Sequence, residues 1–245
     1  MADEALPRRR FLLGAGLAGA GVATGLAAPV VAEAQTQPAA PAPAAAPPAA
    51  NAEPETYLTL TPTEVAFVSA IADTMIPADE LSPSGTDCGV VTYIDRQLAG
   101  AYGAGAKMYR MGPFRRGKPE QGYQLALTPR QYFEAGIAAA NDWSRKTYGG
   151  KEFDQLAPAD RAAALTAMEE GKAEFAHFSA KAFADRLHAL VMEGFFSDPM
   201  YGGNRNMAGW KMIGFPGLPA TYKDVVDRYR DKRYAVPPRS IADFS

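Results

Sequence analysis

Side chains that commonly carry covalent or metal chemistry are scarce in this chain. Its 245 residues include one cysteine and two histidines. On a helix, the spacing between His177 and His188 corresponds to about 16 Å, which is too far for both imidazoles to bind one metal ion. The thiolate and imidazole clusters of zinc or iron–sulfur sites and the C-x-x-C-H haem motif do not occur. We therefore expect no catalytic residue, metal site or cofactor in this chain, although a Ser–His–Asp triad is assembled by folding and spacing leaves it open.

Nucleotide-binding patterns are also missing from the sequence. A dinucleotide fingerprint needs G-x-G-x-x-G between a strand and a helix, whereas no strand pattern precedes Gly103 and Gly105. Gly202 and Gly203 lie beside Arg205 but lack the Lys-Ser/Thr pair of a P-loop. Both glycine pairs are interpreted as loops or turns.

Carboxylates are the remaining candidates for acid–base chemistry. Those near the first expected helices are Asp73, Asp79, Glu80, Asp87 and Asp95. They fall at expected helix ends or on expected polar faces, where solvation explains them at least as well as catalysis does.

Cys88 allows two interpretations. An exported protein meets an oxidising compartment, and no second cysteine of this chain could pair with Cys88 there. Cys88 is then either a small unreactive thiol beside Gly89 or the site of a disulfide with another subunit.

The first residues have the layout of an export signal over 1–34. An apolar run rich in Gly and Ala follows a twin-arginine arrangement formed by Arg8, Arg9, Phe11 and Leu12. Ala32 and Ala34 form an Ala-x-Ala cleavage site. This predicts export by the Tat pathway, which carries folded proteins, to the periplasm or the outer face of the inner membrane. The alternative is that the run is retained as a membrane anchor.

Residues 35–56 are mostly Ala and Pro and are expected to form an extended linker, so the folded domain is expected over 57–245. The formal net charge of −2 and the 47% hydrophobic content indicate an ordinary globular domain. They give no reason to expect nucleic-acid binding, which needs a concentrated excess of Lys and Arg.

The hydrophobic spacing predicts a mainly α, small domain of about five to six helices with long, ordered Gly/Pro-rich loops. Proline-containing capping boxes at 61–64 and 128–131 begin two helices, which Pro77 and the glycines at 149–150 end. Other helices are expected at 90–99, 158–170, 172–193 and 221–230. Residues 101–127 are expected to form an ordered loop, and no alternating strand pattern occurs.

The segment FFSDPMYGGNRNMAGWKMIGFPG, residues 195–217, combines aromatic and methionine side chains with glycines and cations. Such side chains are enriched at the centres of protein interfaces, and glycines let the backbone follow a partner's surface. The residues expected to contact a partner are Phe196, Tyr201, Asn204, Arg205, Met207, Trp210 and Phe215. The open alternative is that these aromatics cap the chain's own core.

This segment, together with IPADELSPSGTDCGVVTYIDRQLAG, GPFRRGKPEQGYQLALTP and the twin-arginine start, resembles the gluconate 2-dehydrogenase subunit 3 family from about Tyr57 onward. The resemblance implies a complex in which a large FAD-containing subunit oxidises a sugar or sugar acid and a cytochrome c subunit passes electrons to ubiquinone. The small subunit would be non-catalytic, would stabilise the flavoprotein and share its Tat signal with it, and would reach the membrane only through its partners. The competing hypothesis is a self-sufficient periplasmic enzyme or ligand-binding protein with a pocket at 195–217.

Overall fold

The computed structural model describes residues 56–115, 117–118, 121, 123–218, 221–223 and 225–244. The described residues contain six α-helices: α2 (Pro62–Met75), α3 (Val90–Ala99), α4 (Pro129–Thr147), α5 (Pro158–Glu169), α6 (Ala180–Phe196) and α7 (Ala208–Ile213). Short 3-10 turns are η2 (Phe153–Gln155), η3 (Pro199–Tyr201), η4 (Arg205–Met207) and η5 (Ile241–Phe244). Strands are absent from this part of the chain, where one isolated bridge joins Gly217 to Arg239. The mainly helical prediction is confirmed; the predicted export signal and most of the linker lie outside the described residues.

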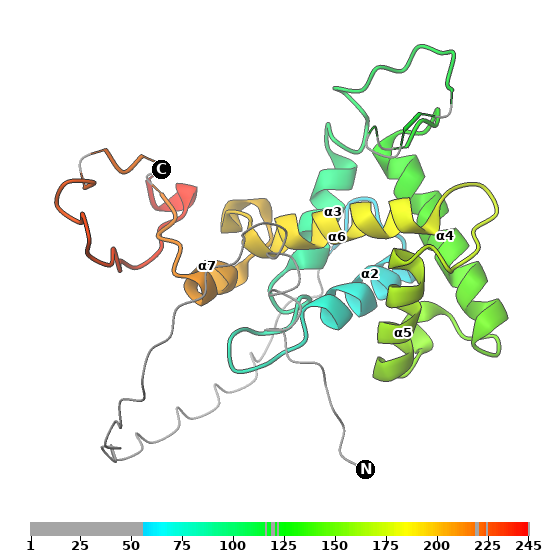
Figure 1. Ribbon diagram of the computed structural model, residues 1–245, viewed down its shortest axis with the longest axis horizontal. Coiled ribbons are helices and arrows are strands. Elements are labelled where there is room, and N and C mark those ends of the chain that lie inside the picture. The colour runs from blue at the N-terminus through cyan, green and yellow to red at the C-terminus, as the bar shows by residue number, and fades with distance from the viewer. Residues whose placement is uncertain are drawn as a thin grey trace, which may run out of the picture. The chain divides into compact units, whose positions relative to one another are not determined.

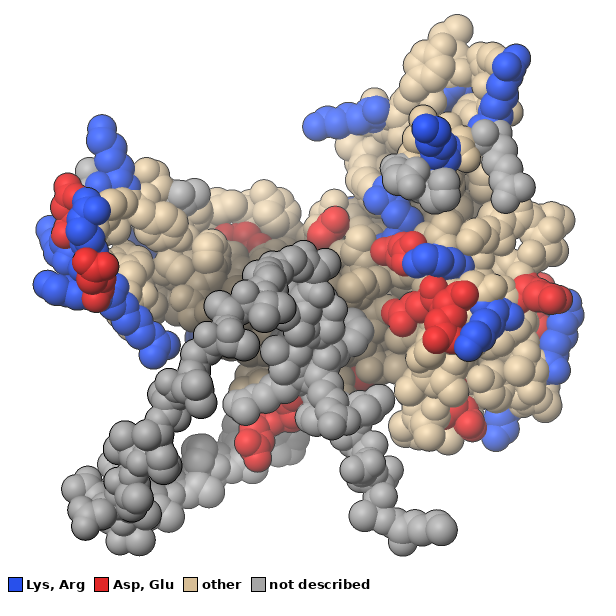
Figure 2. Space-filling model, in the orientation of Figure 1, with Lys and Arg blue, Asp and Glu red and all other residues tan. Residues whose placement is uncertain are grey.

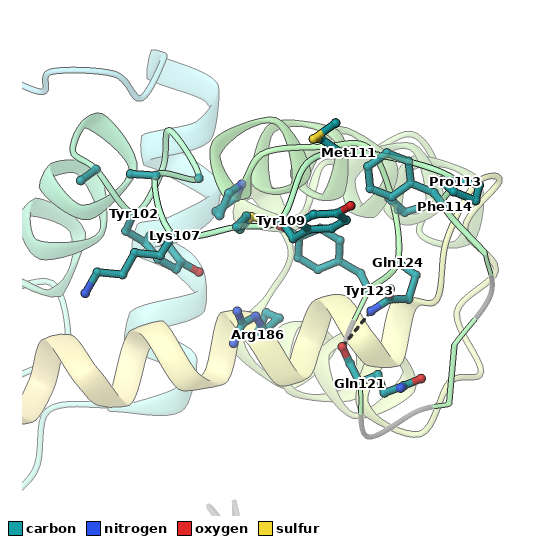
Figure 3. Close-up of a pocket in the computed structure, with 16 residues that line it drawn as sticks. Tyr102, Lys107, Tyr109, Met111, Pro113, Phe114, Gln121, Tyr123, Gln124 and Arg186 are labelled. Atoms are coloured by element: carbon teal, nitrogen blue, oxygen red, sulfur yellow. Dashed lines mark hydrogen bonds between the residues drawn. The ribbon is translucent and has the colours of Figure 1, made fainter.

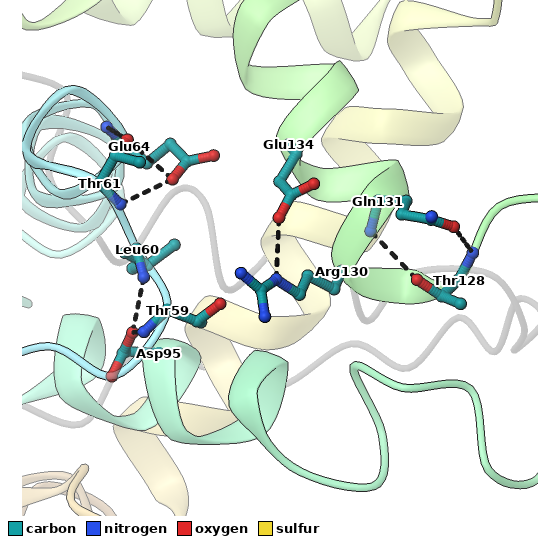
Figure 4. Close-up of polar contacts among 9 residues, drawn as sticks. All are labelled: Thr59, Leu60, Thr61, Glu64, Asp95, Thr128, Arg130, Gln131 and Glu134. Atoms are coloured by element: carbon teal, nitrogen blue, oxygen red, sulfur yellow. Dashed lines mark hydrogen bonds and ion pairs between the residues drawn. The ribbon is translucent and has the colours of Figure 1, made fainter.

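The two predicted capping boxes form as expected (Figure 4). At the start of α2, the Thr61 N–H donates to Glu64 Oε2 at 2.7 Å, and the Glu64 N–H donates to Thr61 Oγ1 at 3.4 Å. Thr128 and Gln131 make the same reciprocal pair at the start of α4. Each box satisfies two backbone donors that the first turn of a helix leaves without partners.

The core gathers around α6, which packs against α3, α4, α5 and α7 (Figure 1). Phe183 of α6 is fully buried, and its ring contacts those of Phe67, Tyr132, Phe133, Phe175 and Phe178. Gly136 lets α4 approach this ring, because a Cβ at this position would lie 2.2 Å from a Phe183 carbon. This aromatic cluster packs α2, α4 and α6 together.

Two predicted helices differ from the structure. α6 begins at Ala180 rather than near residue 172, because the Ser179 hydroxyl accepts the Ala182 N–H at 3.2 Å and caps the helix there. The residues just before it follow an irregular path that places Phe175 and Phe178 on the core. The predicted helix at 221–230 is wrong, since its described residues form turns.

Asp95 differs most from its expected solvated position. Its carboxylate is buried and accepts the N–H groups of Leu58, Thr59 and Leu60 at 2.6–2.9 Å (Figure 4). These bonds fasten the residues that lead into α2 against α3. Asp95 therefore has a structural role that its position on a helix did not indicate.

Candidate partner-binding surface

The segment 195–217 folds into a series of short turns after α6. Asp198 begins the series, because its carboxylate accepts the Met200 N–H at 3.0 Å and also the N–H of Ile241 at 2.8 Å. Gly203 follows where the chain passes close to α6, and a Cβ there would lie 2.2 Å from the Gly194 carbonyl oxygen. The turn geometry at this point therefore requires glycine.

Asn204 holds the middle of the segment from inside. Its side chain is 0% exposed. Its Nδ2 donates to the Ser197 carbonyl at 2.8 Å, and its Oδ1 accepts the Gly209 N–H at 2.8 Å. Asn204, Asn206 and Met207 all have left-handed backbone, with φ of 46°, 56° and 55°. Such conformations persist where surrounding contacts hold them, and the two Asn204 bonds supply those contacts.

Arg205 ties the segment to the beginning of α3. Its backbone N–H donates to the Cys88 carbonyl at 2.9 Å, and its Nη2 donates to Thr92 Oγ1 at 3.3 Å. Gly89 makes this approach possible, because a Cβ there would lie 2.4 Å from the Gly202 carbonyl oxygen. The segment is thus attached to α3 as well as to α6.

Trp210 attaches the end of the segment. Its ring is buried, and Nε1 donates to the Phe196 carbonyl at 2.8 Å. The Phe215 ring stands edge-on to it, with the centroids 5.2 Å apart. Phe195 is buried in the core, so part of this aromatic content completes the chain's own interior.

Four large apolar side chains of the segment stay exposed: Met200, Tyr201, Ile213 and Phe215. We call them the exposed apolar residues of the segment. Tyr201 is 46% exposed and Ile213 is 58% exposed, although buried and partly buried hydrogen bonds of Asn204 and Trp210 hold the backbone of the segment. A backbone held in this way loses little conformational freedom on binding.

The seven residues expected at an interface therefore occupy three kinds of environment. Tyr201 and Phe215 are exposed, whereas Asn204 and Trp210 are buried. Partly buried positions are taken by Phe196, Arg205 and Met207. Met200 and Ile213 are also exposed, but they are not among the seven residues expected at an interface. Residue type alone does not indicate which side chains of a series of short turns point to solvent.

Cys88 lies in the core at 1% exposure, with its Sγ 3.6 Å from the Pro83 carbonyl oxygen. A disulfide with another subunit would require this part of the core to open. That disulfide stays a prediction, and the burial of the thiol favours the unreactive alternative.

Potential metal-binding side chains do not gather in the described part of the chain. No group of three potential metal-binding side chains occurs there, and His177 is exposed on an irregular stretch. Burial raises the pKa of Tyr93 to about 12, with the Glu193 carboxylate adding to the effect, and burial raises the pKa of Tyr132 to about 12. Both phenols therefore stay protonated near neutral pH.

None of the described helices combines the length and the apolar character needed to cross a bilayer.

A cavity of about 940 Å³ lies outside 195–217, beneath the loop that joins α3 to α4 (Figure 3). Its lining comes from residues between Ala101 and Pro129 and from Arg186 of α6. A smaller hollow of about 380 Å³ is lined by residues between Pro216 and Arg239. The competing hypothesis expected a ligand pocket within residues 195–217, but the larger cavity has no lining residue from that segment.

Comparison with known proteins found no match among curated proteins and none among solved structures. A family model described as Gluconate 2-dehydrogenase subunit 3 matches residues 62–217. The match runs from the first residue of α2 to the end of the segment 195–217. Because it covers more than half of the chain, this protein belongs to the gluconate 2-dehydrogenase subunit 3 family.

Proposed function

We propose that this chain is the non-catalytic small subunit of a periplasm-facing, FAD-dependent dehydrogenase complex. In this role it binds and stabilises the flavoprotein subunit and provides the Tat export signal for both. Membership of a subunit 3 family implies other dehydrogenase subunits as partners. FAD and haem c are assigned to those partners, the large subunit and a cytochrome c subunit.

The observation that carries the proposal is the contrast within the segment 195–217. Its backbone is fixed by Asn204, Arg205 and Trp210, yet it leaves four large apolar side chains in water. Exposing apolar surface costs free energy, about 25 cal/mol per Å². A rigid support for exposed apolar side chains is what a permanent subunit interface requires.

A double variant, Tyr201→Ser with Phe215→Ser, tests this surface. Neither side chain belongs to the buried core, so the variant should fold while losing apolar contact with the large subunit. We expect less large subunit to co-purify and the remaining flavoprotein to unfold at a lower temperature. The matched control is Leu81→Ser with Val226→Ser, which removes two exposed apolar side chains elsewhere. Equal recovery of the large subunit with both double variants would overturn this interface.

The export role is tested separately at the predicted signal. Replacing Arg8 and Arg9 by lysine should leave the large subunit and its dehydrogenase activity in the cytoplasm, because lysine keeps the charge but not the twin-arginine pair. Arg10→Lys is the control with the same chemistry beside the motif. Normal export of the large subunit by the double variant would reject the proposed role, and the mass of the mature chain would show whether cleavage follows Ala34.

The competing enzyme hypothesis predicts a different result for the isolated chain. If this protein purified without the other subunits turns over a substrate or carries a bound chromophore, the non-catalytic assignment is wrong.

A further inference from the structure

The loop that joins α3 to α4 has a charge unlike that of the whole protein. We call residues 101–127 the basic loop, because its sequence has five Lys or Arg residues and one Glu, although the chain has a net charge of −2. Figure 2 shows Lys and Arg along the upper right lobe, where Figure 1 places this loop. The exposed, described cations of the basic loop therefore form a local positive surface; they are Lys107, Arg110, Arg115 and Lys118.

Large apolar side chains are exposed on the same loop. Tyr109 is 80% exposed and Met111 is 73% exposed, and Phe114 is also exposed. Together with Tyr123, these side chains line the 940 Å³ cavity. In Figure 3 the rings of Tyr109 and Tyr123 lie close together, with Met111 and Phe114 beside them. The cavity thus has an apolar wall that the chain's own core does not cover.

Two cationic side chains also line the cavity, in addition to its apolar residues. Lys107 comes from the basic loop and Arg186 from α6, and neither forms an ion pair with another described residue. Arg186 is directed from its helix toward the tyrosine rings (Figure 3). Cations at an apolar cavity that have no ion-pair partner among the described residues favour an occupant that carries carboxylates.

Gln121 and Gln124 add polar groups suited to a polypeptide. The Gln124 Nε2 donates to the Gln121 carbonyl at 3.0 Å, and the Gln121 Oε1 accepts the Lys118 N–H at 2.8 Å. Among the described residues, these bonds leave the Gln121 Nε2 as a donor and the Gln124 Oε1 as an acceptor, the two kinds of group that pair with a peptide backbone. A lipid surface would suit the cations and the aromatic rings but would not use this pair.

We propose that the cavity beneath the basic loop binds an extended, carboxylate-bearing segment of the large dehydrogenase subunit, with an apolar side chain of that segment against Tyr109 and Met111. This inference rests on the proposed function and adds a second contact surface to the segment 195–217. Lys107 and Arg186 pair with the carboxylates of the bound segment, and the glutamines pair with its backbone.

Charge reversal tests the contact. The double variant Lys107→Glu with Arg186→Glu changes the charge at the cavity, and Lys146→Glu with Lys151→Glu makes the same change in net charge elsewhere. Association of each full-length variant with the purified large subunit is measured at low and high salt, after circular dichroism has confirmed folding. We expect association at low salt to slow about tenfold for the cavity variant only, with a weaker dependence on salt.

A photo-reactive side chain at Tyr109 identifies the occupant. Cross-linking in the assembled complex should label an Asp- or Glu-rich segment of the large subunit. Labelling of lipid instead, together with binding of the chain to phosphatidylglycerol vesicles, would overturn the inference in favour of a membrane contact.

The outcomes separate the two proposals. If the unaltered chain binds the large subunit and the cavity variant associates as the control does, only this inference fails. If the unaltered chain does not bind the large subunit, both proposals fail.

Discussion

The hydrogen bonds of Asn204 lead to a prediction about what holds the partner-binding segment in place. Replacing Asn204 by alanine removes the amide that bonds to both groups, so the buried Gly209 N–H and the partly buried Ser197 carbonyl lose their partner. It also places a side chain with no polar group at a left-handed φ of 46°. Asparagine tolerates that region better than alanine does.

The two effects have separate magnitudes. Leaving a buried polar group without a partner costs about 1–3 kcal/mol, so two such groups should cost about 3 kcal/mol in the free energy of unfolding. The left-handed backbone adds about 1 kcal/mol for alanine. Since 1 kcal/mol shifts the melting temperature of a domain of this size by about 2–4 °C, Asn204→Ala should lower it by roughly 8–16 °C.

Asn206 provides a matched control for the backbone effect. It is also an asparagine with left-handed backbone, at φ of 56°, but its side chain is exposed. Asn206→Ala should therefore lower the melting temperature by only about 2–4 °C. Asn204→Gly should fall between the two, because glycine removes the backbone cost but not the loss of the hydrogen bonds.

Thermal unfolding followed by circular dichroism measures all three variants, and co-purification with the large subunit measures the effect on binding. Asn204→Ala should reduce recovery of the large subunit more than Asn206→Ala does. Equal melting temperatures for the two alanine variants would refute the reasoning, because they would mean that the buried hydrogen bonds contribute nothing.

Three further predictions concern buried residues that hold the helical domain together. Asp95→Asn should lower the free energy of unfolding, measured in urea, by about 2 kcal/mol, because an amide replaces a carboxylate that accepts three backbone N–H groups; an unchanged urea midpoint would contradict this. Gly136→Ala should destabilise the domain by about 1–3 kcal/mol through its clash with Phe183, whereas a higher melting temperature would mean that the helix preference of alanine prevails. Tyr132→Phe should stabilise by about 1 kcal/mol, because the buried Tyr132 hydroxyl has no hydrogen-bond partner among the described residues. The pKa of Tyr132 is raised from 10.0 to about 12, so the unfolded chain ionises first and stability falls as pH rises through this range; Tyr132→Phe should lose less stability there in pH-dependent melting, and an equal loss would contradict the assignment.

Local sequence was enough to predict where most helices begin and end. The capping boxes at Thr61 and Thr128 depend on groups three residues apart. Whether they form can therefore be predicted without knowledge of the rest of the fold. The start of α6 was missed because its cap, Ser179, follows residues 172–178, in which Phe175 and Phe178 continue the hydrophobic spacing of the helix. There, packing of Phe175 and Phe178 onto the core prevailed over local preference.

The unusual composition of 195–217 also identified the segment as a candidate interface, and the family match is consistent with the predicted resemblance. The sequence did not distinguish the residues that hold the segment from those that it exposes. Asn204 and Tyr201 looked equally suited to an interface, yet one is buried and the other is nearly half exposed.

The amino-acid sequence by itself determined the helical class, most helix ends and the family, because these depend on neighbouring residues and on composition. Only the tertiary structure decided that Asp95 and Asn204 are buried, that Tyr201 stays in water, and that Arg186 of α6 meets the basic loop at one cavity. The physical reason is that burial and charge pairing depend on which distant segments meet, and spacing along the chain does not contain that information.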